Sequence, residues 1–158
     1  MSLKKLIFIY MIIFFNSSLL NSNTLDKSNT TFETIKFDVV SKKIFYDNTL
    51  DREIQVFLQK FFDNNVKVNG FEGNMELFIN NYIENTDYID NGKKIEISLE
   101  FILNINKSLL SEKKTLKGVI NSYGNMTGNF SLNDFDDLKR NVKLELVSRF
   151  SKKLKSEF

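Results

Sequence analysis

The sequence predicts an α+β fold, a two-layer sandwich in which two helices cover one face of a four-stranded, mostly antiparallel sheet, in the order β-α-β-β-β-α. Three observations support it: a long alternating stretch at residues 93–106, an Asn-Gly pair directly before it, and two segments with apolar residues at helical spacing. Successive side chains of a strand point to opposite faces, so the alternation makes one face apolar and the other polar. A sheet with one water-facing side is typically antiparallel.

The alternating stretch organises the rest of the prediction. At about 3.4 Å per residue it would be roughly 45 Å long. Mostly polar residues separate six apolar ones: Ile95, Ile97, Leu99, Phe101, Leu103 and Ile105. Every other element can be placed by asking whether it covers that apolar side.

The composition limits the chemistry of the chain. Its 158 residues include no Pro, Cys, His or Trp and 16 Phe, and 42% are hydrophobic, which is enough for the core of one domain. Without Cys there is no thiolate, and without His the commonest general base and transition-metal ligand is missing. We therefore expect no enzyme and no cofactor, with carboxylate catalysis as the remaining route.

Charge argues against one class of partner. Without Lys4 and Lys5, which belong to the N-terminal segment, 20 basic residues face 20 acidic ones. A nucleic-acid-binding domain normally has a basic excess. We expect no nucleic-acid partner.

Residues 1–22 predict an export signal. Lys4 and Lys5 precede an unbroken apolar run at 6–15, and small polar residues follow at 16–18, which is the order of a secretory signal peptide. The run is shorter than the roughly 20 apolar residues of a membrane span. Because no clear small-x-small pair marks a cleavage site, an uncleaved N-terminal anchor is the alternative.

The remaining chain divides into a polar tether at residues 23–33 and a single domain at 34–158. At the start of the domain, residues 35–40 alternate and predict a strand, which 44–46 either extend or follow as a short second piece. Residues 66–73 contain two Gly and predict a loop.

The first helix is predicted at residues 48–64. Asn48 or Thr49 would cap it, and Asp51 and Glu53 would favour the positive end of its dipole. Apolar residues at i, i+3, i+4, i+7 and i+8 give it one buried stripe. The stripe consists of Ile54, Phe57, Leu58, Phe61 and Phe62.

A second long strand is predicted at residues 75–89. Asn91-Gly92 separates it from the stretch at 93–106, and this pair favours a tight hairpin because both central positions need a positive φ. Asn81 interrupts the alternation, which suggests a β-bulge. The prediction places Met75, Leu77, Ile79 and Ile83 on one face and Glu76, Phe78, Tyr82 and Glu84 on the other.

The last elements are a strand and a helix. Residues 107–114 predict a connection, 115–123 the fourth strand, 123–130 a flexible link and 131–156 a long terminal helix. Ser131 and Asp134 would form a capping box there. The buried stripe of the helix would be Phe135, Leu138, Val142, Leu146, Phe150 and Leu154.

Two helices on one face of the sheet leave the other face open. It would present apolar and aromatic side chains among charged ones, a mixture that suits a protein partner with a polar interior. A solvated face with scattered apolar groups is the alternative. The residues that we assign to contact with a partner are Phe78, Tyr82, Glu96, Ile102 and Tyr123.

The two loops at the ends of the 93–106 strand form the second candidate site. The leucines of the 107–114 connection would insert beside lipid or into a partner, or else fold back on the sheet edge. Lysine ammonium groups bind phosphates as point charges, although exposed hairpin lysines usually only aid solubility. The candidate contacts are Lys93, Lys94, Lys113, Lys114, Leu109 and Leu110.

An exported domain with this order of elements resembles the lipopolysaccharide-assembly lipoprotein family (LptE-like). The resemblance covers about residues 34–155. Its most specific part is the run T-L-K-G-V-I-N-S-Y at 115–123, followed by F-S-L-N-D-F-D-D-L-K-R-N-V-K-L-E-L-V-S-R-F at 130–150, in which a strand ending in a tyrosine leads into a long helix. The other shared spacings are the strand at 35–40, the capped helix from Leu50, the Asn91-Gly92 hairpin and the strand at 95–105.

The resemblance implies a periplasm-facing protein of the Gram-negative outer membrane. Members sit inside the lumen of a large β-barrel translocon (LptD-like), plug and organise it, and contact lipopolysaccharide on its way to the cell surface. The family carries an acylated lipobox Cys after the signal, and this chain has no Cys. Anchoring would come from the barrel, from an uncleaved signal, or from neither.

Two other functions stay open at this point. One is a periplasmic adaptor or secretion-apparatus domain with a similar small sandwich. The other is a carboxylate-based envelope hydrolase, which would need two acids facing each other in a pocket, and the sequence shows no such pair.

Overall fold

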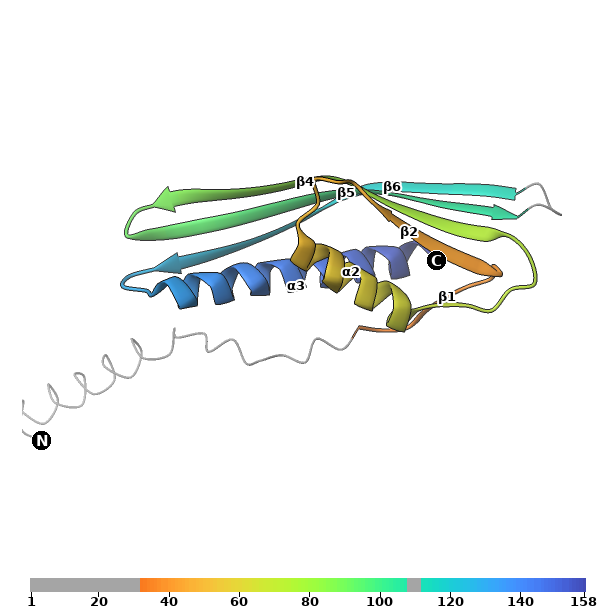
Figure 1. Ribbon diagram of the computed structural model, residues 1–158, viewed down its shortest axis with the longest axis horizontal. Coiled ribbons are helices and arrows are strands. Elements are labelled where there is room, and N and C mark those ends of the chain that lie inside the picture. Colours follow the sequence, from red (N-terminus) through yellow and green to blue (C-terminus); the bar gives the residue numbers. More distant parts are fainter. Residues whose placement is uncertain (1–31, 108–111) are drawn as a thin grey trace, which may run out of the picture.

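Figure 1 shows two layers, a long sheet and two helices packed against one of its faces. The structure is a computed structural model that describes residues 32–107 and 112–158. The elements in chain order are β1 (Ile35–Phe37), β2 (Ser41–Tyr46), α2 (Arg52–Asn65), β3 (Val66–Val68), β4 (Asn74–Ile89), β5 (Gly92–Lys107), β6 (Glu112–Thr127) and α3 (Leu132–Glu157). The predicted α+β sandwich is confirmed. The predicted signal and most of the tether lie outside the described residues.

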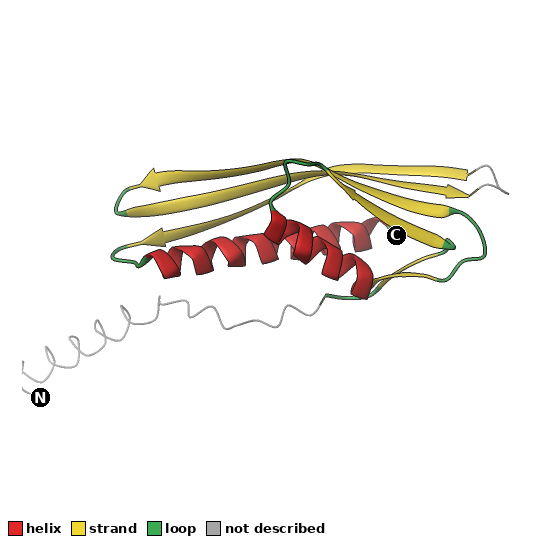
Figure 2. Cartoon of the chain, in the orientation of Figure 1, coloured by secondary structure: helices red, strands yellow, loops and turns green. Residues whose placement is uncertain are grey.

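The main sheet has the strand order β2-β4-β5-β6. Strands β4, β5 and β6 each have 16 residues and pair antiparallel along almost their whole length. The predicted hairpin between β4 and β5 is confirmed, but its turn is shifted by one residue: Ile89 pairs with Gly92, so Asp90 and Asn91 are the central residues, and of these only Asn91 has a positive φ, 56°. Strand β2 pairs parallel with the start of β4, and parallel neighbours need a crossover connection. Helix α2 lies in that connection (Figure 2).

The first predicted strand is corrected by the structure. Residues 35–40 do not join the main sheet: β1 ends at Phe37 and pairs parallel with β3 in a separate two-stranded sheet. The predicted loop at 66–73 therefore contains a strand, and the short second piece at 44–46 is part of main-sheet strand β2. Pairing across the chain decided this, because β1 buries Ile35 and Phe37 next to Val66 only when the two segments lie together.

Strand β6 is longer than predicted at both ends. It runs from Glu112 to Thr127 and pairs with β5 from Lys107 to Gly92. The predicted connection at 107–114 and link at 123–130 are correspondingly shorter. The reason is the long partner strand β5. It offers hydrogen bonds to backbone groups of β6 that would otherwise bond to water, even where the sequence of β6 is polar and contains Gly.

The core lies between β5 and the two helices. The predicted inner face of β5 is confirmed, with Leu99 and Phe101 at most 1% exposed. Phe150 of α3 packs edge-to-face on Phe101 at 5.0 Å between ring centroids and on Phe61 of α2 at 5.9 Å. A Cβ at position 118 would come within 2.8 Å of the Phe101 ring, so Gly118 gives that ring its room.

The helix ends explain where the helices sit. The predicted cap of α2 is corrected: Asp51, not Asn48 or Thr49, accepts hydrogen bonds from the backbone N–H groups of Glu53 and Ile54. At the other end, Lys42 of β2 donates to the carbonyl of Val66 at 2.6 Å and to that of Phe62. Helix carbonyls left without partners favour such a cation. Within the described residues, neither helix is long and apolar enough to cross a bilayer.

The start of α3 is as predicted. The Ser131 hydroxyl accepts from the backbone N–H of Asp134, and the Asp134 carboxylate accepts from the backbone N–H of Ser131. This reciprocal capping box fixes the helix directly after β6. Helix α3 then runs beneath β5 and β6, and Gly124 of β6 allows its close approach.

Candidate interaction surface

The face of the sheet opposite the helices, called the open face below, carries an apolar row. Phe45, Phe78 and Ile102 are register partners on β2, β4 and β5 and therefore lie side by side. The rings of Phe45 and Phe78 stack with their centroids 4.8 Å apart and their planes 13° apart. The row ends on β6 at Lys117. An aromatic and aliphatic stripe thus crosses β2, β4 and β5 and meets a lysine on β6, and no described helix covers it.

A second group lies on the open face nearer the β4–β5 hairpin. Glu96 and Tyr123 are register partners, and Tyr123 is 62% exposed. Glu96 pairs with Lys94 at 3.0 Å. Arg149 of α3 approaches the Tyr123 ring at 6.0 Å and donates to the carbonyl of Asn121. These contacts hold an exposed ring beside a carboxylate, which is a pattern typical of polar protein contacts.

Four of the five predicted partner-contact residues lie on the open face, and Tyr82 does not. The predicted bulge exists: the register shifts between Asn80 and Ile83, and Asn81 has φ 47°. The extra residue reverses the alternation beyond it. Tyr82 and Glu84 consequently point to the helices, and Ile83 is 44% exposed on the outer side.

The reversed residues join a cluster of charges between β4, α2 and α3. Lys143 of α3, only 2% exposed, donates to Asp51 at 2.9 Å and to Glu53 at 3.1 Å, and Glu84 lies 3.9 Å away. Tyr82 donates to Glu84 at 2.5 Å. Buried charges are tolerated when they are paired and hydrogen-bonded in this way.

The protonation of the cluster follows from these contacts. Burial opposes the charge on Lys143, but the hydrogen bonds and charges of Asp51 and Glu53 outweigh it, so the pKa of Lys143 is raised. For Asp51, burial acts to raise the pKa, while the Lys143 hydrogen bond and the backbone N–H groups lower it, and the net pKa is lowered. Burial and then the Glu84 carboxylate raise the pKa of Tyr82. Both shifts favour the charged forms of Lys143 and Asp51, and their ion pair holds the start of α2 against α3.

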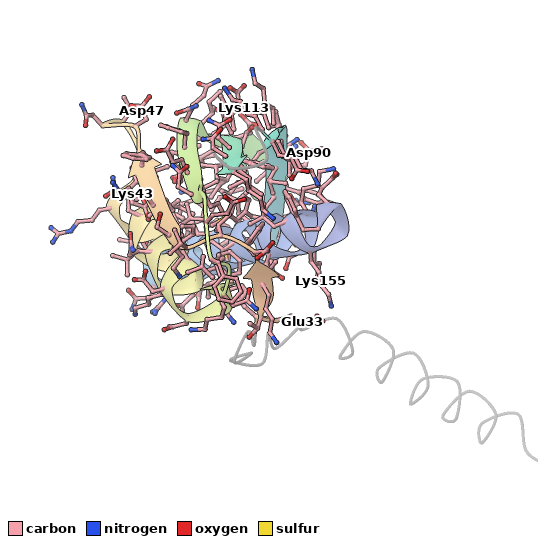
Figure 3. The ribbon with its side chains drawn as sticks, turned by 90° about the vertical axis from the view of Figure 1, so that its right-hand side faces the viewer. Glu33, Lys43, Asp47, Asp90, Lys113 and Lys155 are labelled. Atoms are coloured by element: carbon pink, nitrogen blue, oxygen red, sulfur yellow. The ribbon has the colours of Figure 1, made fainter. Side chains whose placement is uncertain are left out.

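The four predicted lysines lie at two opposite ends of the sheet. Lys93 and Lys94 follow the hairpin turn, and Lys113 and Lys114 stand at the far end, opposite Asn106 and Ile105. Lys94 and Lys113 are on the open face, whereas Lys93 and Lys114 are on the helix side, as their partner residues show. The structure does not bring the four together. In Figure 3, Lys113 lies on the strand side of the molecule, and Lys155 and Glu33 lie together on the helix side.

Lys93 is surrounded by aromatic rings. Its Nζ lies 4.5 Å from the ring centre of Phe135, 5.4 Å from that of Tyr88 and 5.9 Å from that of Phe130. Cation–π attraction holds an ammonium group in such a place. Leu109 and Leu110 lie outside the described residues, so their predicted role stays a prediction.

Sequence reasoning missed Phe45 as a surface residue. Its stacking on Phe78 depends on the parallel register between β2 and β4, and no local pattern encodes that pairing.

Among the described residues, no group of three or more acidic side chains could hold a metal ion.

Comparison with known proteins supports the fold. No protein-family model matches the chain, and no curated protein matches its sequence. A solved structure of a minor lipoprotein from Acinetobacter baumannii is similar with a TM-score of 0.52 and 12% identity, over 75% of this chain and 94% of that one. Rare lipoprotein B from Shewanella oneidensis is similar with a TM-score of 0.48 and 11% identity, over 75% of this chain and 96% of that one. The chain therefore shares the fold of the minor lipoprotein from Acinetobacter baumannii.

Proposed function

We propose that this chain is a non-enzymatic subunit of the outer-membrane lipopolysaccharide export translocon. It would sit against the inner wall of a large β-barrel protein on the periplasmic side and assist lipopolysaccharide transport and assembly of the outer membrane. The observation on which the proposal depends is the open face, a broad sheet surface with aromatic and charged side chains and no described element over it.

The chemistry of the open face fits the lumen of a barrel. The walls of such a lumen are polar, and the open face offers ion-pairing groups such as Glu96 and Lys94 around the stacked rings of Phe45 and Phe78. Interfaces with a central aromatic group and a polar rim concentrate their binding energy in the aromatic residues. The stacked pair would be the centre and the charges the rim.

Lysines at the two ends of the sheet would contact the phosphates of lipopolysaccharide. Lys94 and Lys113 face the same side as the apolar row. Lys93 lies among three rings at the hairpin end. A cation whose position is fixed loses less freedom when it binds an anion. We assign the hairpin end the first contact with the lipid headgroup.

The setting of the protein is part of the proposal. The export signal predicted at residues 1–22 would take the chain to the periplasm. The structures similar in fold are described as a minor lipoprotein and a rare lipoprotein B, which supports a place in the bacterial envelope. Because this chain has no Cys to acylate, contact with the barrel would hold it at the outer membrane.

Co-purification tests this function. The tagged full chain is recovered from envelope extracts, and we expect a large outer-membrane β-barrel protein and lipopolysaccharide to accompany it. Phe78→Glu should reduce recovery of the barrel roughly tenfold or more, as for a central interface residue. Phe71→Glu, the same change at a fully exposed loop position, is the matched control and should leave recovery unchanged. A chain that recovers neither the barrel nor lipopolysaccharide would contradict the proposal.

The second candidate is a periplasmic adaptor or secretion-apparatus domain. The same open face supports it, because aromatic surfaces of this kind also suit soluble partners. In that case the partner that co-purifies with the chain, and is lost from the Phe78→Glu variant, would be a soluble envelope protein and not a barrel. The identity of the recovered partner decides between the two.

A further inference from the structure

A half-enclosed pocket lies at the end of the molecule where α3 finishes. It has a volume of about 330 Å³ and lies between β1 with the two residues after it, the far ends of β5 and β6, and the last residue described. Specific ligand pockets have volumes of roughly 300–1,000 Å³, so this one would hold one small or slender molecule. Its residues on β5 and β6 face the helix side of the sheet and not the open face.

The floor of the pocket is apolar. Phe37 and Val39 line it with at most 3% exposure, and Ile105 of β5 is half-buried beside them. The ring of Phe158 meets that of Phe37 at 4.9 Å, edge to face, and closes one side. A floor formed by these apolar side chains favours a hydrocarbon occupant over a sugar or a nucleotide.

The lysines at the rim of the pocket differ in the ion pairs and hydrogen bonds that they form. Lys107 is neutralised by Asp38 at 2.6 Å. Lys114 donates to the backbone carbonyl of Glu157 at 2.9 Å and lies 3.8 Å from the centre of the Phe158 ring. Lys36 is exposed and has no ion pair or hydrogen bond with any described residue. The carboxylate of Glu112 also lines the pocket. Three lysines therefore meet two acids there, and Lys36 and Lys114, which form no salt bridge with a described residue, are the cations available to an anionic group at the mouth.

We propose that this pocket binds a single acyl chain with an anionic headgroup. The hydrocarbon tail lies on Phe37, Val39 and Ile105, and the headgroup meets Lys36 and Lys114. One slender chain suits the small volume, and the lysines select a negative head over a neutral one. The proposal does not depend on the translocon function, since no residue of the pocket belongs to the open face. A free fatty acid and a lysophospholipid share this chemistry.

Displacement of a dansyl-labelled fatty acid from the full chain tests the proposal. Octanoate, decanoate and dodecanoate should compete with rising affinity, about fourfold for each methylene until the pocket is full, because each buried methylene adds a constant increment. Decanol should compete roughly tenfold less well than decanoate because it lacks the charge. Lysophosphatidylglycerol and lipopolysaccharide are tested as two further competitors in the same assay. Comparison of their affinities with those of the fatty acids distinguishes a lysophospholipid or a multi-chain lipid from a free fatty acid as the ligand.

Variants locate the site. Ile105→Trp fills the pocket and should abolish competition, while Ile83→Trp, the same change at a half-exposed position on β4, should not. Lys36→Glu should weaken dodecanoate roughly tenfold, and Lys60→Glu on the exposed side of α2 should have no effect. Lys36 is exposed, so its replacement leaves folding intact. Equal affinity of Lys36→Glu and the unchanged protein, equal affinity for decanol and decanoate, or no binding at all would overturn the proposal.

Discussion

The two faces of the main sheet are built from the same three long strands and have opposite properties. On the helix side, β5 contributes side chains such as Leu99 and Phe101 that are at most 1% exposed. On the open face, Phe78 and Ile102 are half-buried, and Tyr123 is 62% exposed. One face is filled by α2 and α3, and the other keeps aromatic groups in water. The difference separates residues that hold the fold from residues that are free to bind.

The bulge at Asn81 exchanges which residues of β4 point to each face. Before it, β4 sends its apolar residues inward, and after it Tyr82 and Glu84 turn inward while Ile83 turns outward. The inner layer therefore changes from apolar packing to the charge cluster around Lys143. A single inserted residue decides which side chains a partner can reach.

The largest expected loss of stability comes from a substitution in the core on the helix side of the sheet. Phe101→Ala removes a ring that packs between Phe150 and Gly118, and we expect it to lower the free energy of unfolding by about 3–5 kcal/mol. Phe78→Ala on the open face should cost about 1 kcal/mol or less, because that ring has water beside it in the free protein. Urea unfolding followed by far-ultraviolet circular dichroism measures both. Equal losses would mean that the open face is part of the core.

Removal of the buried lysine is the next largest change. Lys143→Met leaves Asp51, Glu53 and Glu84 without their common cation and should cost about 2–4 kcal/mol, since breaking a buried pair leaves uncompensated charge. Lys139→Met removes a partly exposed ion pair to the same Glu84 and should cost less than about 1 kcal/mol. The same urea titration compares them. If Lys139→Met proves as costly as Lys143→Met, burial is not the reason for the effect.

The bulge gives a smaller effect. Asn81→Val places a β-branched side chain at φ 47° and should cost about 1–2 kcal/mol. Asn81→Gly, which accepts that backbone angle freely, should stay within about 0.5 kcal/mol of the unchanged protein. Urea midpoints of the two variants provide the test. A harmless valine would show that the bulge is not required at this position.

The smallest effect is a dependence on acid. Asp51 has a lowered pKa in the folded protein, so its contribution to stability is present above the ordinary Asp pKa of about 4 and is lost as the pH falls through the lowered value. Asp51→Asn keeps a capping side chain but should flatten the fall in urea midpoint between about pH 5 and pH 2. Asp136→Asn is the matched control: it lies at an exposed position of α3 beyond the first turn, its carboxylate forms no hydrogen bond or ion pair with a described residue, and the change should leave the slope unaltered. A slope that Asp51→Asn does not alter would remove this carboxylate from the acid response.

The sequence by itself determined the elements whose signals are local. Alternation placed β5 and its inner face, the Asn91-Gly92 pair indicated the hairpin, and the Ser131–Asp134 capping box placed the start of α3. It also revealed a bulge near Asn81. These features depend on residues within a few positions of each other, where φ preferences and side-chain period act directly.

Only the tertiary structure decided what depends on contacts across the chain. The pairing of β1 with β3 and the parallel register of β2 on β4, which stacks Phe45 on Phe78, join segments separated by a helix. The direction of Tyr82 beyond the bulge depended on the register with β5, because one extra residue reverses every later side chain. The burial of Lys143 among three carboxylates from α2 and β4 has the same origin. Local propensity carries no information about which distant segments meet. The strands, which have local signals, were therefore predictable, whereas the residues on the two faces of the sheet were predictable only in part.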